Sequence, residues 1–189
     1  TPCVHQKVTI QISKGCHVLG YCKVSGSDEI AALFQSEAEL LELLKEQGME
    51  GVPQCLYCGE LIERVFLFVQ NTEKTRQSKV PHEWSNLHEH FLIELQRKTV
   101  QNVIFEKSDY YNTLQGLQAH MDWLPKFMNR NVIEKTISKI VNSYKGKIVE
   151  FSTYHADFTP WNMFAEKNRL FVFDWEYACM TYPPMLDHY

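Results

Sequence analysis

Alternating apolar and polar positions open the chain and then give way to helical spacing. Residues 7–13 alternate and are rich in β-branched side chains, which predicts a strand ending at Gly15. A second strand is predicted over 17–25. Because Ser27-Asp28 is typical of a helix N-cap and Gly48 suits the position just beyond a C-terminus, a helix is predicted from about 28 to 47.

This predicted helix carries an apolar stripe that one acidic residue interrupts. The stripe consists of Ile30, Leu33, Phe34, Leu41 and Leu44. Glu37 falls in its middle, and a carboxylate on a buried face is costly unless a cation pairs with it. Lys23, on the preceding strand, is the candidate partner, so the pattern predicts a Lys23–Glu37 ion pair. The alternative is an exposed strand lysine and a glutamate at the edge of the core.

The remaining pattern predicts a short sheet segment followed by helices. Two strands are expected over 54–58 and 64–70 around a Gly59-Glu60 turn, and the polar run 71–79 is expected to be a loop between two parts of the molecule. Helices are predicted over about 83–102, 110–129 and 132–144, with a short strand over 148–151.

Two apolar segments near the C-terminus, 163–165 and 170–173, flank the polar turn 166–169 and predict a β-hairpin. Folding the hairpin about Asn168 sets Asn162 opposite Asp174. Opposed residues have Cβ atoms roughly 5 Å apart, and amide and carboxylate oxygens at that distance can share a magnesium ion. A slip of one residue would break this pairing.

Composition narrows the classes of function. The chain has 189 residues, 44% of them hydrophobic, which suffices for one domain or two small lobes. Its net charge of −4 leaves no broad basic surface for nucleic acid. No apolar run approaches the length of a membrane span, and no signal peptide opens the chain.

The six cysteines are too scattered to predict a disulfide framework, and reduced thiols in a cytoplasmic protein are the simplest interpretation. Cys55-x-x-Cys58 could form half of a zinc site with one of the histidines 82, 88 or 90. Because no second pair stands at finger-like spacing, two small apolar cysteines beside a strand are the preferred interpretation.

The motif His155-x-Asp157, with Asn162 five positions after the aspartate, precedes the predicted hairpin, and Phe173-Asp174-Trp175-Glu176 ends it. This arrangement resembles the catalytic core of the protein-kinase-like fold. In detail it is similar to the aminoglycoside phosphotransferase and choline kinase families, which carry His-Gly-Asp-x4-Asn and an apolar strand ending in Asp-(Trp/Phe)-Glu. Ala156 departs from the usual glycine.

The resemblance implies an α+β, two-lobed kinase-like fold. Its small N-terminal lobe would be an antiparallel sheet with one helix, over 1–72, and its mainly helical lobe with the catalytic hairpin would span 73–189. It also implies a chain that begins inside the small lobe and ends before the helices that complete the large lobe in relatives. No G-x-G-x-x-G phosphate loop occurs, and Gly15-x4-Gly20 lacks the Lys-Ser/Thr of a P-loop.

The resemblance further implies transfer of the ATP γ-phosphate to a hydroxyl of a small molecule, with magnesium as cofactor. Asp157 would steer the hydroxyl, and His155 would brace its loop. Asn162 and Asp174 would hold magnesium, and Lys23, oriented by Glu37, would contact phosphates. The backbone near 69–72, including Val69 and Gln70, would bind adenine. Trp175 would pack where the Phe of Asp-Phe-Gly packs in protein kinases, the role of Glu176 stays open, and Asp187 would brace the catalytic loop.

Three other functions compete with this one. A protein kinase is one of them, but Asp174-Trp175-Glu176 and Ala156 argue against it. The missing glycine-rich loop favours a non-catalytic nucleotide-binding or scaffold domain of the same fold. A metal-dependent phosphohydrolase would explain the His-x-Asp pair, but the sequence lacks the second His/Asp cluster that such sites need. The identity of the acceptor and the oligomeric state are left open.

Overall fold

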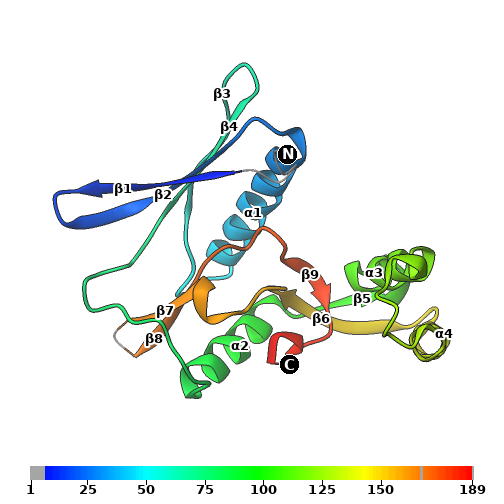
Figure 1. Ribbon diagram of the computed structural model, residues 1–189. Helices are drawn as coiled ribbons and strands as arrows, with labels where there is room; N and C mark the ends of the chain where they lie inside the picture. Colours follow the sequence, from blue (N-terminus) through cyan, green and yellow to red (C-terminus); the bar gives the residue numbers. More distant parts are fainter. Residues whose placement is uncertain (1–6, 167, 189) are drawn as a thin grey trace.

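The computed structural model describes residues 7–166 and 168–188. An N-terminal four-stranded antiparallel sheet has the order β1-β2-β4-β3. Its strands are β1 (Val8–Lys14), β2 (His17–Ser25), β3 (Cys55–Ile62) and β4 (Val65–Asn71). Helix α1 (Asp28–Glu46) follows β2 and packs against β3 and β4 (Figure 1). The first two strands and this helix were predicted to within one residue at each end.

The second part of the molecule holds three helices, a three-stranded sheet and a hairpin. The helices are α2 (Asn86–Thr99), α3 (Asp109–Ala119) and α4 (Arg130–Tyr144). The sheet, in the order β5-β6-β9, consists of β5 (Gln101–Ile104), β6 (Ile148–Tyr154) and β9 (Cys179–Tyr182). The hairpin consists of β7 (Met163–Glu166) and β8 (Arg169–Val172). Single 3-10 turns cover Phe105–Lys107, Met121–Trp123, Pro160–Asn162 and Leu186–His188.

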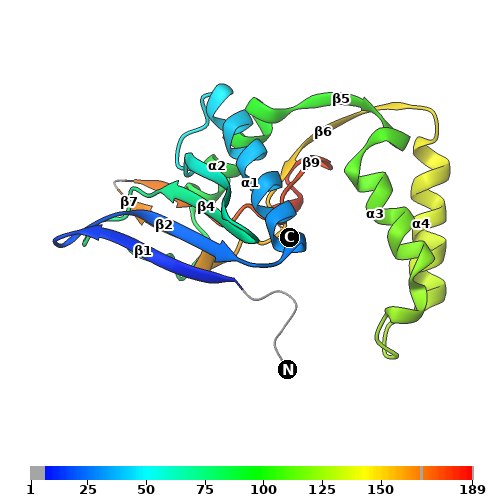
Figure 2. The same ribbon diagram turned by 90° about the horizontal axis from the view of Figure 1, so that it is seen from above.

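Helices α3 and α4 lie side by side and project away from the rest of the molecule (Figure 2). They follow β5 and precede β6, so this pair of strands forms the base of the projection. The side chain of Asp109, at the start of α3, accepts hydrogen bonds from the backbone of Met180 and Thr181 and so ties α3 to β9.

The β3–β4 turn differs from its prediction. Gly59 and Glu60 lie inside β3, where they pair with Leu67 and Phe66, and the chain reverses at Glu63-Arg64. Arg64 adopts a positive φ of 59°, and its N–H donates to the side chain of Glu60 at 2.7 Å. A side-chain hydrogen bond therefore stabilises a turn that contains no glycine.

Two predicted helices are shorter than their apolar spacing suggested. The helix expected over 83–102 ends at Thr99, because residues 101–104 pair with β6 as a strand. The helix expected over 110–129 ends at Ala119 and continues only as a 3-10 turn. Strand β6 is longer than expected, and β9 was not predicted at all.

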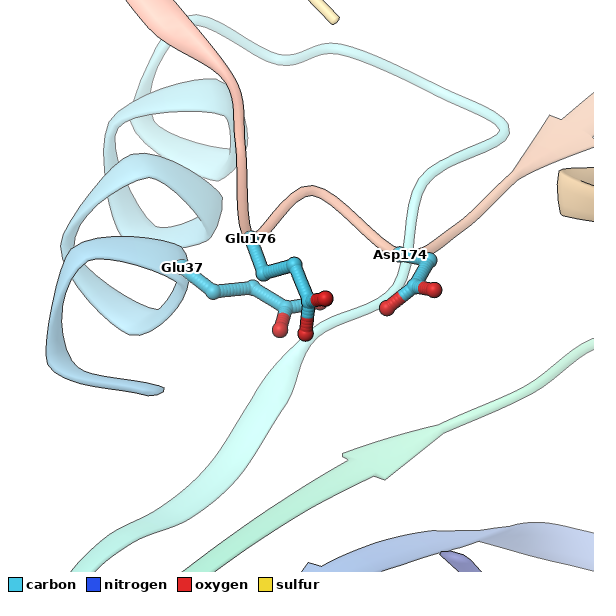
Figure 3. Close-up of side chains that lie close together, drawn as sticks. All are labelled: Glu37, Asp174 and Glu176. Atoms are coloured by element: carbon cyan, nitrogen blue, oxygen red, sulfur yellow. The ribbon is translucent and has the colours of Figure 1, made fainter. Parts of the chain in front are cut away.

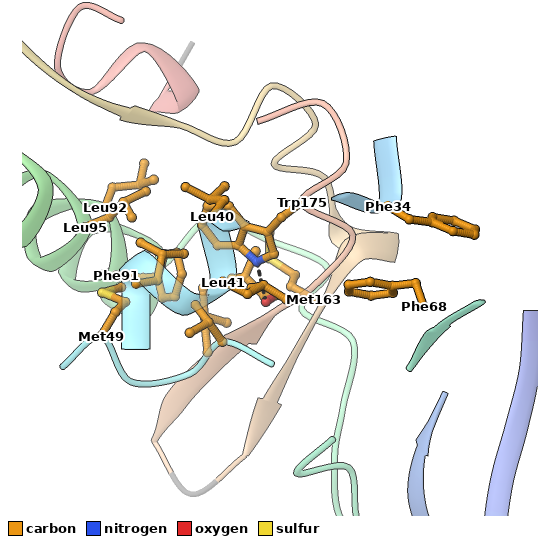
Figure 4. Close-up of a cluster of buried hydrophobic side chains, with 14 of the residues drawn as sticks. Phe34, Leu40, Leu41, Met49, Phe68, Phe91, Leu92, Leu95, Met163 and Trp175 are labelled. Carbon is orange, nitrogen blue, oxygen red and sulfur yellow. Dashed lines mark hydrogen bonds between the residues drawn. The ribbon is translucent and has the colours of Figure 1, made fainter. Parts of the chain in front are cut away.

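The main hydrophobic core joins the N-terminal sheet and α1 to α2 and the hairpin (Figure 4). On one side of this core lie Phe34 of α1 and Phe68 of β4. On the other side lie Phe91 of α2 and Met163 of β7. Trp175 lies between them, only 1% exposed, with its Nε1 donating to the carbonyl of Val172. The predicted division into two lobes, 1–72 and 73–189, stays a prediction. Residues from both ranges contribute to the main hydrophobic core.

A second, smaller core lies at the base of the projection. It consists of Phe105, Leu114, Ile137 and Phe151. Because Phe151 lies on β6, this strand links the second core to the segment that follows it, which carries the predicted catalytic residues.

Candidate active site

Lys23 and Glu37 form the predicted ion pair. The Nζ of Lys23 on β2 lies 2.7 Å from a carboxylate oxygen of Glu37 on α1, and the two side chains are 6% and 0% exposed. Although burial opposes it, the carboxylates of Glu37 and Asp174 hold the pKa of Lys23 above its ordinary value. Burial raises the pKa of Glu37 against the opposing charge of Lys23. The other Glu37 oxygen accepts from the backbone N–H of Trp175 at 3.1 Å, so α1 also holds the segment after β8.

Asp174 contacts the same ammonium group of Lys23. Its Oδ1 lies 2.5 Å from Lys23 Nζ. The residue has a positive φ of 68°, which turns the chain at the end of the hairpin. Although burial opposes it, Lys23 and then Lys7 keep the pKa of Asp174 below its ordinary value.

Three carboxylates therefore converge on one point (Figure 3): Glu37, Asp174 and Glu176 each offer an oxygen within 4.8 Å of the others. Such a group can hold a cation, and in this structure two ammonium groups perform that function. Lys23 lies 3.7 Å from Glu176, and Lys7 hydrogen-bonds Glu176 and lies 3.7 Å from Asp174. The cluster is a charge network organised around lysines.

The loop between β6 and β7 is fixed from beneath by Asp187. Its two carboxylate oxygens accept from the backbone N–H groups of His155 and Ala156 at 2.7 and 3.1 Å, as the resemblance implied. Burial raises the pKa of Asp187 to about 6, although both hydrogen bonds oppose the shift. Ala156 has a φ of 69°, a backbone conformation that favours glycine.

Both ring nitrogens of His155 have hydrogen-bond partners in the backbone. The residue is fully buried, its Nδ1 accepts from the N–H of Asp157 at 3.2 Å, and its Nε2 lies 3.1 Å from the carbonyl of Phe173. Burial lowers the pKa of His155 to about 4, so the ring is neutral and donates through Nε2. This one side chain joins the loop to the end of the hairpin.

Asp157 and Asn162 contact one another directly. The Nδ2 of Asn162 donates to the carboxylate of Asp157 at 2.8 Å and to its carbonyl at 3.1 Å. The hydroxyl of Thr159 donates to the other carboxylate oxygen at 3.2 Å. Asp157 is thus held in a fixed orientation, and Oδ1 is the atom with which Asn162 would coordinate a cation.

The predicted cross-strand pair of Asn162 and Asp174 is wrong by one residue. Met163 pairs with Val172, and the N–H of Phe173 donates to the carbonyl of Asn162 at 2.9 Å. Two residues separate the paired ends Glu166 and Arg169, so the centre of the turn lies before Asn168 rather than on it. The prediction centred the turn on one residue, whereas the commonest hairpin loops have two residues, and this difference shifts the pairing by one.

A cavity of about 310 Å³ opens beside this network, between the N-terminal sheet and the hairpin. Aromatic and aliphatic side chains form much of its wall: Tyr21, Val80, Trp161, Met163, Phe164, Phe171 and Phe173. Lys7, Lys23 and Asp174 supply charge at one part of it. Gln70, together with residues 71 and 72, also lines it, whereas Val69 pairs with Cys22 and Tyr57 within the sheet.

Sequence reasoning missed Lys7, Thr9, Tyr21 and Trp161 as lining residues. Strand alternation could have found the first three. Thr9 pairs with Lys23, so Lys7 and Thr9 share its face of the sheet, as does Tyr21 two residues before the lysine. Trp161 follows no such rule, because it lies in the 3-10 turn before β7.

The cysteine pair fits the interpretation preferred from sequence. Cys55 and Cys58 are free thiols that pack against the main core, and burial raises the pKa of Cys58 to about 11. Among the described residues, the one group of potential metal ligands that converges is that of Glu37, Asp174 and Glu176. No helix in the described ranges is long and apolar enough to cross a membrane.

Comparison with solved structures finds the same overall fold in proteins described as small-molecule kinases. The streptomycin–ATP ternary complex of APH(2'')-IIa matches with a TM-score of 0.52 and 18% identity, over 94% of this chain and 67% of that one. ADP-bound aminoglycoside phosphotransferase APH(2'')-Ib matches at 0.50 and 18%, over 92% and 67%. A putative fructosamine-3-kinase from Haemophilus somnus 129PT matches at 0.51 and 12%, over 89% and 65%.

These matches confirm the kinase-like α+β fold that the motifs implied. At 12–18% identity the likeness extends to the fold, and the chain spans about two thirds of the length of each of these proteins. No family model and no curated protein matches the chain in sequence.

Proposed function

We propose that this chain is the nucleotide-binding and phosphoryl-transfer core of a kinase that acts on a hydroxyl group of a small molecule. The observation that carries the proposal is the position of Lys23, which bridges Glu37 and Asp174 at the wall of a largely apolar cavity. A buried ammonium held by a helix glutamate, beside an aspartate at the end of a strand, is the arrangement by which kinase folds bind nucleotide phosphates. The solved structures of similar fold include complexes with ATP and ADP.

The residues divide the work by position. Lys23 would contact the phosphates, while the backbone at 69–72, where Gln70 lines the cavity, would bind the base. Asp157 would orient the acceptor hydroxyl and take its proton, because its carboxylate is fixed by Asn162 and Thr159. His155 and Asp187 would keep that loop in place.

Asp174 and Asn162 fit magnesium by their chemistry, since both offer hard oxygen atoms. When bound, the ion would offset negative charge on the phosphate oxygens. Asp174 would exchange its contact with Lys23 for the ion, which leaves the ammonium group for the phosphates.

The test separates binding from chemistry. ATP affinity is measured by calorimetry with and without magnesium for the wild type, Asp174→Asn and the control Asp122→Asn, which changes an exposed carboxylate on the projection. We expect magnesium to strengthen ATP binding in the wild type and the control but not in Asp174→Asn. Wild-type protein that binds no nucleotide under any condition would refute the proposal.

Turnover is then measured as ADP release with a panel of hydroxylated acceptors. Asp157→Asn should keep its ATP affinity and lose turnover by about a hundredfold or more, because only the orienting base is lost. A wild type that binds ATP but transfers phosphate to no acceptor would favour the non-catalytic domain. A phosphohydrolase would instead release phosphate without ATP-dependent transfer.

A further inference from the structure

Lys7 occupies a position that the kinase motifs do not explain. It directly precedes β1, yet its ammonium reaches the segment after β8, where it hydrogen-bonds Glu176 and lies 3.7 Å from Asp174. Its side chain is 24% exposed, and it lines the same cavity as Lys23. Lys7 and Lys23 thus both lie beside Asp174 in the wall of this cavity.

Lys7 and Lys23 make similar contacts, because each pairs with a buried glutamate and also approaches Asp174. Lys23 is held by the fully buried Glu37 and touches Asp174, while Lys7 is held by Glu176, whose side chain is 6% exposed, and also approaches Asp174. Glu37 contacts only Lys23 among the two lysines, whereas Asp174 and Glu176 each lie within 4 Å of both ammonium groups. Lys7 is the more exposed of the two lysines, at 24% against 6%, so a ligand in the cavity can reach it.

The charge balance indicates what kind of ligand would use this arrangement. Two ammonium groups and three carboxylates leave the network with one net negative charge when it holds no ligand. If Asp174 turns to a divalent cation, the two lysines are left facing the cavity with only Glu37 and Glu176 as partners. A chain of phosphates, which carries several negative charges, complements two ammonium groups.

We propose that Lys7 is a second phosphate-binding residue, held in place by Glu176, so that the nucleotide's phosphates lie between two ammonium groups. The inference rests on the proposed nucleotide-binding function and adds to it a residue and a role for Glu176.

The experiment compares nucleotides that differ only in phosphate number. Affinities for ATP, ADP and AMP with magnesium are measured by calorimetry for the wild type, Lys7→Met and Lys7→Arg. Lys14→Met is the matched control, because this exposed lysine lies at the other end of β1. We expect Lys7→Met to weaken ATP binding about tenfold, ADP binding less and AMP binding hardly at all, since one charge-assisted contact is lost. Lys7→Arg should retain most of the affinity, and Lys14→Met all of it.

A brace between the two parts of the molecule is the competing role for Lys7, and the readout separates the two. The proposal is wrong if Lys7→Met weakens the binding of AMP as much as the binding of ATP. It is also wrong if the substitution changes no nucleotide affinity and only lowers the melting temperature. The double variant Lys7→Met/Glu176→Gln removes both charges together and protects the fold, and it should show the same dependence on phosphate number. A wild type that binds none of the three nucleotides would instead overturn the proposed function itself.

Discussion

Ala156 shows how a single residue can be strained by the role of its loop. Its backbone has a φ of 69°, and its N–H must point at Asp187. A non-glycine residue in the left-handed region costs roughly 1–2 kcal/mol. The strain persists because the carboxylate of Asp187 binds two successive N–H groups of the loop.

Replacing Ala156 by glycine should therefore stabilise the protein. The relief of strain exceeds the extra entropy of glycine in the unfolded chain, so Ala156→Gly should raise the free energy of unfolding by about 0.5–1 kcal/mol. Ala32→Gly, at an exposed position inside α1, is the control and should lower it by about 1 kcal/mol. Urea denaturation measures both. If both variants lost the same free energy of unfolding, Ala156 would carry no strain.

His155 couples the stability of the same loop to pH. Its pKa of about 4 lies below that of an unfolded chain, near 6.5, so between these values the folded protein holds fewer protons on the ring. Stability therefore rises with pH across this window and is lost on acidification, by up to about 3 kcal/mol. Asp187, with a pKa raised to about 6, acts in the opposite direction, since its folded form favours the proton.

Variants at the two positions should thus show opposite slopes. Relative to the wild type, His155→Asn should gain stability as pH falls from 6.5 to 4.5, and Asp187→Asn should lose it. Denaturation in urea at a series of pH values measures both differences, in which the other titrating groups cancel. Parallel curves for all three proteins would show that neither side chain changes its pKa on folding.

At the scale of elements, the accuracy of sequence reasoning depended on how local the determining contacts are. Strand β2 and helix α1 were predicted closely because a capping serine and a glycine mark the ends of the helix within the sequence itself. The end of α2 was missed because pairing of 101–104 with a strand far along the chain overrides helical spacing. Strand β9 was also missed, because it forms by pairing with β6 and not through a local pattern.

The hairpin illustrates the limit for the site itself. Its two strands were predicted correctly, but the register was off by one because turn length decides pairing and the residues 166–169 fit more than one turn. The Lys23–Glu37 pair was predictable since a lone carboxylate in an apolar stripe requires a cation. The contact of Lys7 with Glu176 joins positions 169 residues apart, and no local pattern indicates it.

At the scale of the whole molecule, the two cores separate stability from the site. The main core holds α1 against the hairpin, and through Glu37 it positions Lys23 and the backbone of Trp175. The second core holds α3 and α4 together at the base of the projection. Strand β6 contributes Phe151 to the second core and is followed directly by His155, so it connects the second core to the catalytic loop along the chain.

Truncation of one buried side chain in each core should separate these roles. Ile137, on α4, is 3% exposed, and Ile137→Ala should cost about 2–5 kcal/mol through the cavity it leaves. Amide exchange over 109–144 should increase, while the affinity for ATP and magnesium should stay within about twofold, because no described residue of the second core lines the cavity.

Leu41→Ala is the matched change in the main core, since Leu41 is fully buried one turn after Glu37 on α1. We expect a similar loss of stability together with weaker nucleotide binding, because α1 then holds the Lys23–Glu37 pair less firmly. Calorimetry and hydrogen exchange on the same samples measure both effects. If Ile137→Ala weakened ATP binding as much as Leu41→Ala, the two cores would behave as one cooperative unit, and β6 would transmit the change to the catalytic loop.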